Sequence, residues 1–364
     1  MTNVALLYDP LFLEHDHPFH PENSRRLQAI MQRLRASDVW TALTSLPFTP
    51  ASFETLARVH TPRYIERVYA LSARGQAALD VDTYLNSASF SAAALAVGAS
   101  IAAAEAVMSG EARRAFALVR PPGHHAFPDH GEGFCLFNNV AFAALQALGE
   151  LDDHIDGAWS PSAQRHHRNA KPERVMIVDF DVHHGNGTQA IFYDDPRVLF
   201  VSVHEYGRGI YPGTGSVAER GAGAGLGATV NIPLPPGVGD FGYARVFDEV
   251  IVPLAYQFKP NAILVSAGFD AHWRDPLAHM GVSLAGFGRM VRVLRALSDA
   301  LCGGRLIFIL EGGYDLEVLS WAVLNTFRVL LGEDDVQDPI GACTCDELPV
   351  DEILEAVRRA AMVE

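Results

Sequence analysis

The stretch RVMIVDFDVHHGNG, residues 174–187, joins an apolar run to a dense group of polar side chains. The run has no polar alternation, which is typical of a parallel strand that is covered on both faces. Because side chains alternate along a strand, Asp179, Asp181 and His183 are expected to project to one face near its carboxyl end. Open α/β sheets bind their ligands at that end of the strands, so the stretch predicts a metal site there.

Short apolar runs of the same kind recur along the chain, and longer segments with helical periodicity lie between several of them. This alternation predicts βαβ units and a mostly parallel sheet. Because no internal repeat or low-complexity linker divides the sequence, we expect one α/β domain over residues 1–364. The other predicted strands begin at Val4, Phe116, Val198, Ala262 and Leu306, and the predicted helices span 89–108, 243–258 and 284–301.

Composition and charge narrow the class of protein. The chain has 364 residues, of which 49% are hydrophobic and 20% are charged, values close to those of globular proteins. The net charge is −15, and residues 333–355 form an acidic C-terminal segment with nine carboxylates and no Lys or Arg. Because the sequence has no basic arm or stripe, nucleic acid is not an expected partner.

Neither a membrane segment nor a signal peptide is predicted. Residues 83–104 are uncharged and long enough to span a bilayer, but they are mostly Ala and Ser and include Asn86. A helix buried in the protein core fits this composition better. The first residues lack the charged and apolar regions of a signal peptide, so we expect a soluble, cytoplasmic protein.

Three further segments resemble functional motifs but have simpler interpretations. Residues 151–172 are polar and turn-rich, which indicates a surface insertion, and the adjacent histidines within it are interpreted as loop residues. Cys343 and Cys345 form a CxC pair without neighbouring soft ligands, whereas structural zinc normally needs four. The glycine-rich run 221–227 precedes a predicted strand and not a helix, so it is interpreted as a turn and not as a phosphate-binding loop.

A second strand ends in SAGFDAH, residues 266–272, and would bring Asp270 to the same edge of the sheet. Together with Asp181 and His183 this makes three protein ligands and leaves a fourth position open. Structural zinc sites are closed by four protein ligands, whereas catalytic zinc sites keep one position for water. The three residues therefore predict a catalytic zinc site.

Two more strand ends carry groups suited to acid–base chemistry. In RPPGHHA, residues 120–126, a glycine-led turn would let His124 and His125 reach one pocket, where imidazoles can exchange protons near neutral pH. For this motif taken alone, a histidine pair in an ordinary loop is the alternative. In LEGGY, residues 310–314, the glycines would let Tyr314 turn inward and donate to a developing oxyanion.

The motifs RPPGHHA, GFCLFNN, DFDVHHGNGT, YPGTG, SAGFDAH and EGGY occur in this order along the chain. As an ordered set they resemble the histone deacetylase and acetylpolyamine amidohydrolase superfamily, and more closely its class II branch. The resemblance implies a single domain with the arginase/deacetylase-like fold, a central, mostly parallel sheet of about eight strands flanked by helices. It also implies hydrolysis of an N-acyl amide by a metal-bound water. Arginases share the fold, but their two-metal site needs more carboxylate ligands than these motifs provide.

Carried over residue by residue, the resemblance assigns most of the catalytic site. It makes Asp181, His183 and Asp270 the ligands of one Zn2+ per chain. His125 matches the general base that later acts as general acid, and Tyr314 matches the oxyanion-stabilising tyrosine. The other catalytic matches are His124, Asp179, which orients His124, and Asn186, which stands behind His125 where class I members have Asp.

The resemblance also assigns the substrate channel. Phe134 and Tyr211 match its two walls, although the family more often has Phe at the second position. Polyamine-selective class II members carry Glu at the channel mouth, where this chain has Leu277. K+ is expected near the zinc strand, at residues matching Asp179 and Ser202. The remaining substrate-binding matches are Gly133, Gly312 and Asp82, the last of them at the rim of the channel.

The leading hypothesis is therefore a zinc-dependent amidohydrolase that removes acetyl or a related acyl group from acyl-lysine. The alternatives are an acetylpolyamine amidohydrolase and, from another class, a catalytically weak acyl-lysine binding protein. Leu277 offers no counter-charge to a polyamine, which favours an acyl-lysine peptide or protein over a small acylated amine. Neither nucleic acid nor a membrane is an expected partner, and self-association into a homo-oligomer is left open.

Overall fold

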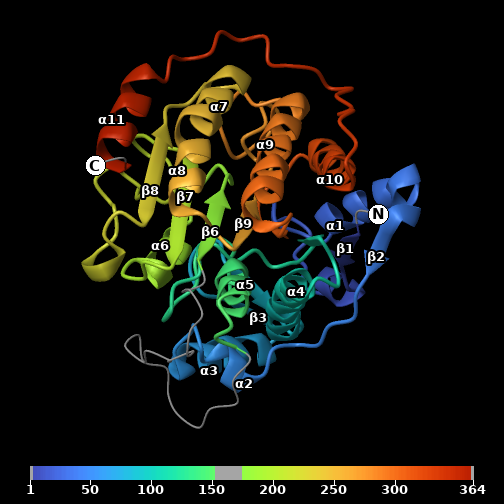
Figure 1. Cartoon of the computed structure of the whole chain (residues 1–364). Coiled ribbons are helices and arrows are strands. Elements are labelled where there is room, and N and C mark those ends of the chain that lie inside the picture. The colour runs from blue at the N-terminus through green and yellow to red at the C-terminus, as the bar shows by residue number, and fades with distance from the viewer. Residues whose placement is uncertain (1–2, 152–173, 362–364) are drawn as a thin grey trace.

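The centre of the structure, a computed structural model that describes residues 3–151 and 174–361, is one parallel sheet (Figure 1). Within the described residues, eight strands follow the order β2-β1-β5-β10-β9-β6-β7-β8, and every neighbouring pair is parallel. The predicted domain with a central parallel sheet is thereby confirmed. The strands are β1 (Val4–Leu7), β2 (Leu43–Ser45), β5 (Arg114–Ala117), β6 (Val175–Asp179), β7 (Val198–Glu205), β8 (Thr229–Leu234), β9 (Ala262–Ala267) and β10 (Leu306–Leu310).

Burial explains which strands the sequence predicts. Every strand of this sheet except β2 is buried along its whole length, so its apolar run is visible in the sequence. The glycine-rich run 221–227 leads into β8, as expected. Strand β2 has only three residues, half-buried or exposed at the edge of the sheet, and carries no such run. It was therefore not predicted.

Helices cover both faces of the sheet. They are α1 (Arg25–Arg35), α2 (Phe53–Leu56), α3 (Pro62–Ala73), α4 (Ser89–Ser109), α5 (Asn139–Ala147), α6 (Asn186–Phe192), α9 (Leu284–Cys302), α10 (Leu316–Leu331) and α11 (Asp351–Ala361). One layer contains α4 and α5, and the other contains α1, α9 and α10 (Figure 1). A short antiparallel pair, β3 (Gln76–Ala78) and β4 (Tyr84–Asn86), packs against α3.

Helix α4 is the one helix among the described residues that is long and apolar enough, by length and composition, to cross a membrane. It packs against α5, β5 and β10, and most of its residues are buried. A Cβ at Gly98 would stand 1.8 Å from the backbone oxygen of Thr49, so even a methyl group has no space there. A helix that is apolar all round is typical of a protein core, and the predicted core helix is confirmed.

The predicted helix over 243–258 is interrupted. The structure has α7 (Asp240–Val246), a π-helical turn (Phe247–Ile251) and then α8 (Val252–Phe258), which contains Pro253 in its first turn. Proline has no N–H to continue the α-helical hydrogen bonding, and its ring clashes with the carbonyl one turn earlier. A wider π turn before the proline accommodates this clash.

The acidic segment 333–355 runs over the surface from α10 and ends in α11 (Figure 1). Its Glu347 carboxylate accepts the backbone N–H groups of Gly239, Phe241 and Gly242 at 3.1, 3.0 and 3.0 Å, which fixes the segment to the start of α7. The CxC cysteines lie in this segment as free thiols. Of the predicted insertion, residues 152–172 lie outside the described residues.

Candidate active site

The predicted site residues lie beyond the carboxyl ends of the central strands. Strand β6 ends at Asp179, whose Oδ1 accepts the backbone N–H of Asp181 at 3.2 Å. Such a side-chain-to-backbone turn competes with strand pairing and ends the strand. Asp181 and His183 therefore stand in the following turn and not on the strand itself. The alternation argument is wrong for these two residues, although they still lie close together.

Three side chains converge with the spacing of metal ligands: Asp181, His183 and Asp270. One ligand atom from each lies within 4.8 Å of the others, and His183 Nδ1 is 3.2 Å from Asp181 Oδ1 and 3.4 Å from Asp270 Oδ2. Asp270 Oδ2 is buried without a hydrogen-bond partner. A buried carboxylate oxygen in this state is unfavourable unless a cation joins it, so the donor set fits a zinc ion.

Backbone amides hold the two carboxylates of this cluster in place. Asp181 Oδ2 accepts the N–H of Gly312 at 2.8 Å, and Asp270 Oδ1 accepts the N–H of Val182 at 2.8 Å. A Cβ at Gly312 would lie 2.1 Å from Asp270 Oδ2 and 2.6 Å from Asp181 Oδ2. Gly312, predicted as a substrate-binding residue, thus lies directly against the cluster and leaves its space open.

His124 and His125 lie side by side next to the cluster, with ring centroids 3.9 Å apart. His124 Nδ1 is 3.0 Å from Asp179 Oδ2, and its Nε2 is 3.7 Å from Asp181 Oδ1. Burial lowers the pKa of His124, but the carboxylates of Asp181 and Asp179 outweigh burial and raise this pKa to about 10. His124 is therefore held as a cation near neutral pH.

His125 has the opposite electrostatic environment. Its Nδ1 lies 2.8 Å from Asn186 Oδ1, at the start of α6. Burial, together with the positive charges of His124 and His183, lowers the pKa of His125 well below its ordinary value. A neutral imidazole beside a charged one provides a proton acceptor next to a proton donor.

Two aromatic rings and a glycine frame the space above these histidines. The Phe134 ring meets the Tyr314 ring edge-on at 5.9 Å, and the Tyr211 ring meets His125 at 5.0 Å. Gly133 has φ +53°, and a Cβ there would lie 2.5 Å from His125 Cδ2 and 2.7 Å from Tyr211 Oη. Only glycine fits at this position, because both its backbone conformation and its surroundings exclude a side chain.

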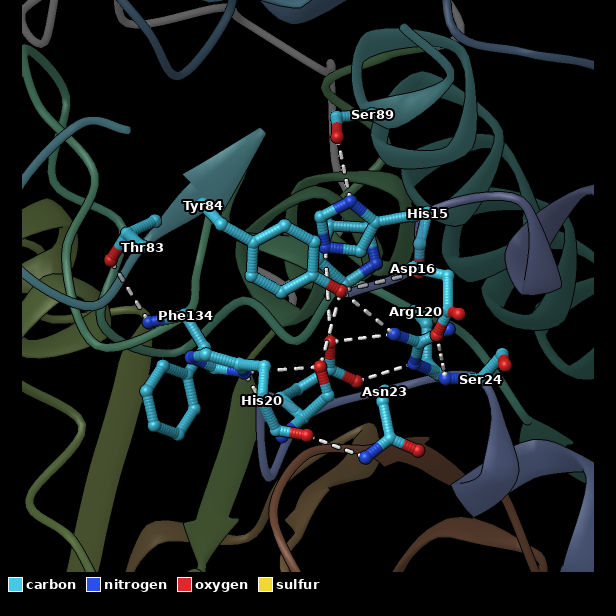
Figure 2. A network of polar contacts seen from close by, with 12 residues as sticks. His15, Asp16, His20, Asn23, Ser24, Thr83, Tyr84, Ser89, Arg120 and Phe134 are labelled. Atoms are coloured by element: carbon cyan, nitrogen blue, oxygen red, sulfur yellow. Dashed lines mark hydrogen bonds and ion pairs between the residues drawn. The ribbon is translucent and has the colours of Figure 1, made fainter. Parts of the chain in front are cut away.

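A polar network supports the Phe134 side of this space (Figure 2). The backbone N–H of Phe134 donates to Thr83 Oγ1 at 3.1 Å, and its ring lies edge-on to His20 at 4.6 Å. His20 Nε2 in turn lies 2.9 Å from the backbone oxygen of Asp82, whose side chain is exposed. The predicted rim residue is thus next to the channel wall.

Leu277 and Tyr314 are joined through one buried carboxylate. Asp275 accepts the backbone N–H of Leu277 at 3.0 Å and that of Tyr314 at 2.7 Å. Leu277 keeps 37% of its surface exposed, as expected of a residue at the mouth of a channel. Asp275 is not predicted as a site residue, although it lies shortly after the SAGFDAH motif, because its function depends on the distant Tyr314 backbone.

Two further positioning groups, Glu311 and Arg26, were missed by sequence reasoning. Glu311 is buried, and its Oε2 accepts the N–H groups of Gly123 and His124 at 2.7 and 3.2 Å. Arg26 Nε donates to the backbone oxygen of Gly313 at 2.8 Å. Glu311 could have been predicted because it belongs to the EGGY motif. Arg26 could not, because its sequence context is that of an ordinary arginine on a helix.

The two residues predicted to bind K+ are adjacent, since Asp179 pairs with Ser202 in the register between β6 and β7. Ser202 Oγ lies 2.9 Å from His204 Nδ1, and both oxygens of Asp179 have partners in His124 and the Asp181 amide. These side-chain oxygens all have hydrogen-bond partners, whereas the Oγ of Ser266, which pairs with Asp179 from β9, is buried without one. The K+ site stays a prediction.

Comparisons with known proteins agree with this geometry. The family model described as histone deacetylase domain matches residues 20–330. Histone deacetylase 14, chloroplastic, of Arabidopsis thaliana is 39% identical over 386 residues, which cover 100% of this chain and 85% of that protein. A probable deacetylase of Archaeoglobus fulgidus is 39% identical over 335 residues, covering 91% and 87%. A crystal structure of the HDA15 HD domain superimposes with a TM-score of 0.86 at 36% identity, covering 99% of this chain and 94% of that one.

The fold and the relatives together define the class of protein, a deacetylase-type hydrolase on an α/β sheet. The chain belongs to the histone deacetylase family. The family resemblance inferred from the ordered motifs is thereby confirmed.

Proposed function

We propose that this protein is a zinc-dependent deacetylase that removes acetyl or a related acyl group from the lysine side chains of peptides or proteins. The observation that carries the proposal is the buried Asp270 Oδ2, which has no hydrogen-bond partner and lies with Asp181 and His183 beside the histidine pair. Zinc held by these three residues would supply Lewis acidity and would lower the pKa of a bound water toward neutrality.

The chain's own groups then divide the proton transfers between them. His125, kept neutral by its environment, accepts a proton at Nε2 from the attacking water and returns it to the leaving amine. His124, whose Nδ1 faces Asp179 Oδ2 at 3.0 Å, would provide a positive charge beside the reacting carbonyl. Tyr314 Oη donates to the oxyanion that develops as the carbonyl is attacked.

The channel residues select the shape of the substrate. Phe134 and Tyr211 place aromatic rings near Tyr314 and His125, which suits the apolar stem of an acylated lysine. Leu277, half-exposed beside Asp275, adds an apolar rather than a charged surface at the mouth. This favours acyl-lysine in a peptide over a polyamine, whose distal cation would gain no partner from Leu277.

The test is turnover of an acetyl-lysine peptide by zinc-loaded protein, with the Tyr314→Phe variant alongside. The variant is expected to keep its zinc and its KM but to lose about 10²–10³-fold in kcat, because the phenol donates mainly in the transition state. Wild-type protein that holds zinc and turns over neither acyl-lysine nor acylpolyamine would support an acyl-lysine binding protein instead.

A further inference from the structure

A carboxylate that the catalytic scheme does not use lies behind the orienting amide of His125. Glu132 Oε1 accepts a hydrogen bond from Asn186 Nδ2 at 2.7 Å, and Asn186 Oδ1 faces His125 Nδ1 at 2.8 Å. The three groups form a chain from the channel wall to the imidazole.

The chemistry of each group fixes the direction of this chain. An ionised carboxylate only accepts hydrogen bonds, so the side of Asn186 that faces Glu132 must be its NH2 group. The amide oxygen therefore faces His125 and also accepts the N–H of Gly187 at 3.0 Å. An amide oxygen cannot donate, so the hydrogen between Asn186 and His125 must be carried by Nδ1 of the imidazole.

This hydrogen decides which nitrogen of His125 can act as a base. In a neutral imidazole one nitrogen carries the hydrogen and the other carries the lone pair. With Nδ1–H directed at Asn186, the lone pair is on Nε2, where the proposed mechanism needs it. A reversed amide would donate to Nδ1 and would place the hydrogen on Nε2, so the imidazole could no longer accept a proton there.

Glu132 is itself held in place from the channel side. Burial and the nearby Glu132 carboxylate raise the pKa of the Tyr211 hydroxyl, and His130 Nε2 lies 3.8 Å from Glu132 Oε2. The backbone oxygen of Glu132 accepts the N–H of Cys135 at 2.9 Å, which closes the turn that carries Gly133 and Phe134. The carboxylate is therefore positioned from several sides before it reaches Asn186.

We propose that Glu132 is a positioning residue that fixes the tautomer of His125 by orienting the side-chain amide of Asn186. This inference rests on the proposed function, because it assumes that His125 is the base. Glu132 acts on His125 through Asn186.

The first test is the kinetics of two variants with zinc-loaded protein and an acetyl-lysine peptide. Glu132→Ala is expected to lower kcat by about 10–100-fold with KM and zinc content unchanged, because some His125 adopts the unproductive tautomer. Glu132→Gln keeps the shape of the side chain but can donate as well as accept hydrogen bonds. Its kcat is therefore expected to lie between that of wild type and that of Glu132→Ala. The matched control is Glu66→Ala, which removes an exposed carboxylate of α3 that takes no part in these contacts and should leave kcat unchanged.

The second test repeats Glu132→Ala in an Asn186→Asp background. Aspartate presents an acceptor oxygen to His125 in either orientation, so there is no amide left to orient. The Glu132→Ala substitution should then cause no further loss of kcat, and it should restore some activity by relieving the repulsion between two neighbouring carboxylates. Equal losses in both backgrounds would show that Glu132 only supports the loop, and would overturn the inference.

The third measurement reads the tautomer directly, by nitrogen and carbon NMR of selectively labelled histidine. Wild-type His125 should show Nδ1–H, and Glu132→Ala should show a substantial Nε2–H population. An unchanged tautomer in Glu132→Ala would also overturn the inference. Failure of the proposed function is distinguishable, because zinc-loaded wild type would then lack turnover while the tautomer still responded to Glu132.

Discussion

The surroundings of Asp270 indicate metal binding, and those of Gly133 constrain the position of His125. Asp270 is buried with one oxygen that has no hydrogen-bond partner, which is tolerable when a cation joins the cluster and unfavourable otherwise. Gly133 is confined by its positive φ and by its closeness to His125 and Tyr211. Each of them leads to a prediction that separates its local effect from a general loss of stability.

Replacing Asp270 with Ala should remove metal binding while leaving the fold intact. Three ligands hold the ion, and losing one is expected to lower zinc affinity by at least about 10–100-fold. The protein itself loses the hydrogen bond to Val182, at about 1 kcal/mol, and the contact with His183. Metal analysis and circular dichroism test this, with Asp82→Ala as a carboxylate control outside the cluster. Full zinc occupancy in Asp270→Ala would refute the assignment of this ligand.

Replacing Gly133 with Ala should displace His125. The new methyl group would stand 2.5 Å from the imidazole, and such a displacement is expected to lower kcat/KM by about 10²-fold. Gly110→Ala is the control, because it also has a positive φ, +83°, but open space around it. That variant should lose about 1 kcal/mol of stability and keep its kcat/KM. Equal kinetics in the two variants would contradict the close contact.

Helix α1 and the turn after β5 are joined by a buried ion-pair network. Glu22 accepts Arg120 Nη2 at 2.8 Å and Arg26 Nη1 at 3.1 Å, and all three side chains are fully buried. Figure 2 shows Arg120 at the centre of this network, beside His15 and Tyr84. Burial raises the pKa of Glu22, but Arg120 and Arg26 outweigh burial and lower this pKa to about 2.

This network predicts an acid-sensitive part of the stability. A carboxyl group with a lowered pKa in the folded state contributes stability above its unfolded pKa, near 4.5, and loses it as the pH falls toward 2. For Glu22 this contribution is about 3 kcal/mol. Glu22→Gln should be less stable by about 3–5 kcal/mol at pH 7, since it leaves two buried guanidiniums without a counter-charge.

Denaturant unfolding between pH 7 and pH 3 measures this effect. Wild type should lose stability as the pH falls, whereas the Glu22→Gln variant should show a smaller slope over the same range. Asp299→Asn is the control, because Asp299 pairs with Arg113 and Arg114 nearer the surface. Parallel slopes in wild type and Glu22→Gln would contradict the role of this carboxylate.

The proposed mouth of the substrate channel is formed by segments that are distant in the sequence. It combines the loop before β4, the turn at 133–134, the segment at Tyr211 and the loop that carries Leu277. Three of these segments follow β5, β7 and β9 and meet because parallel strands place their carboxyl ends along one edge of the sheet. The loop before β4 belongs to the separate antiparallel pair and joins them through the contact of His20 with Phe134. Substrate preference therefore depends on how distant loops combine.

Leu277→Glu should shift the preference toward acylated polyamines. A new carboxylate at the mouth would attract the distal ammonium, and an exposed ion pair of about 1 kcal/mol corresponds to about a fivefold change in the ratio of kcat/KM values. The measurement compares an acetyl-lysine peptide with N-acetylputrescine, with the peptide preferred by wild type. Leu226→Glu is the control, since this exposed leucine lies before the amino end of β8 and so away from the carboxyl ends of the strands. A wild-type preference for the polyamine, or no shift in Leu277→Glu, would contradict the prediction.

Local chemistry in the chain was sufficient to predict the strands, the core helix and the groups that meet at the candidate metal site. A buried strand needs an uninterrupted apolar run, and a parallel sheet brings the polar residues after such runs to one edge. Asp181, His183 and Asp270 could therefore be grouped from their positions after two such runs. The edge strand β2 and the π turn before Pro253 could not be predicted from the sequence, because neither produces a periodic apolar pattern.

Contacts between distant segments had to come from the folded structure. Arg26 reaches Gly313 across 287 positions of sequence, Glu311 reaches Gly123 across 188, and Glu132 reaches Asn186 across 54. The sequence around a charged residue looks the same whether its side chain faces water or a buried amide. Its partner is chosen by the packing of helices and loops around the sheet, which no short stretch of sequence contains.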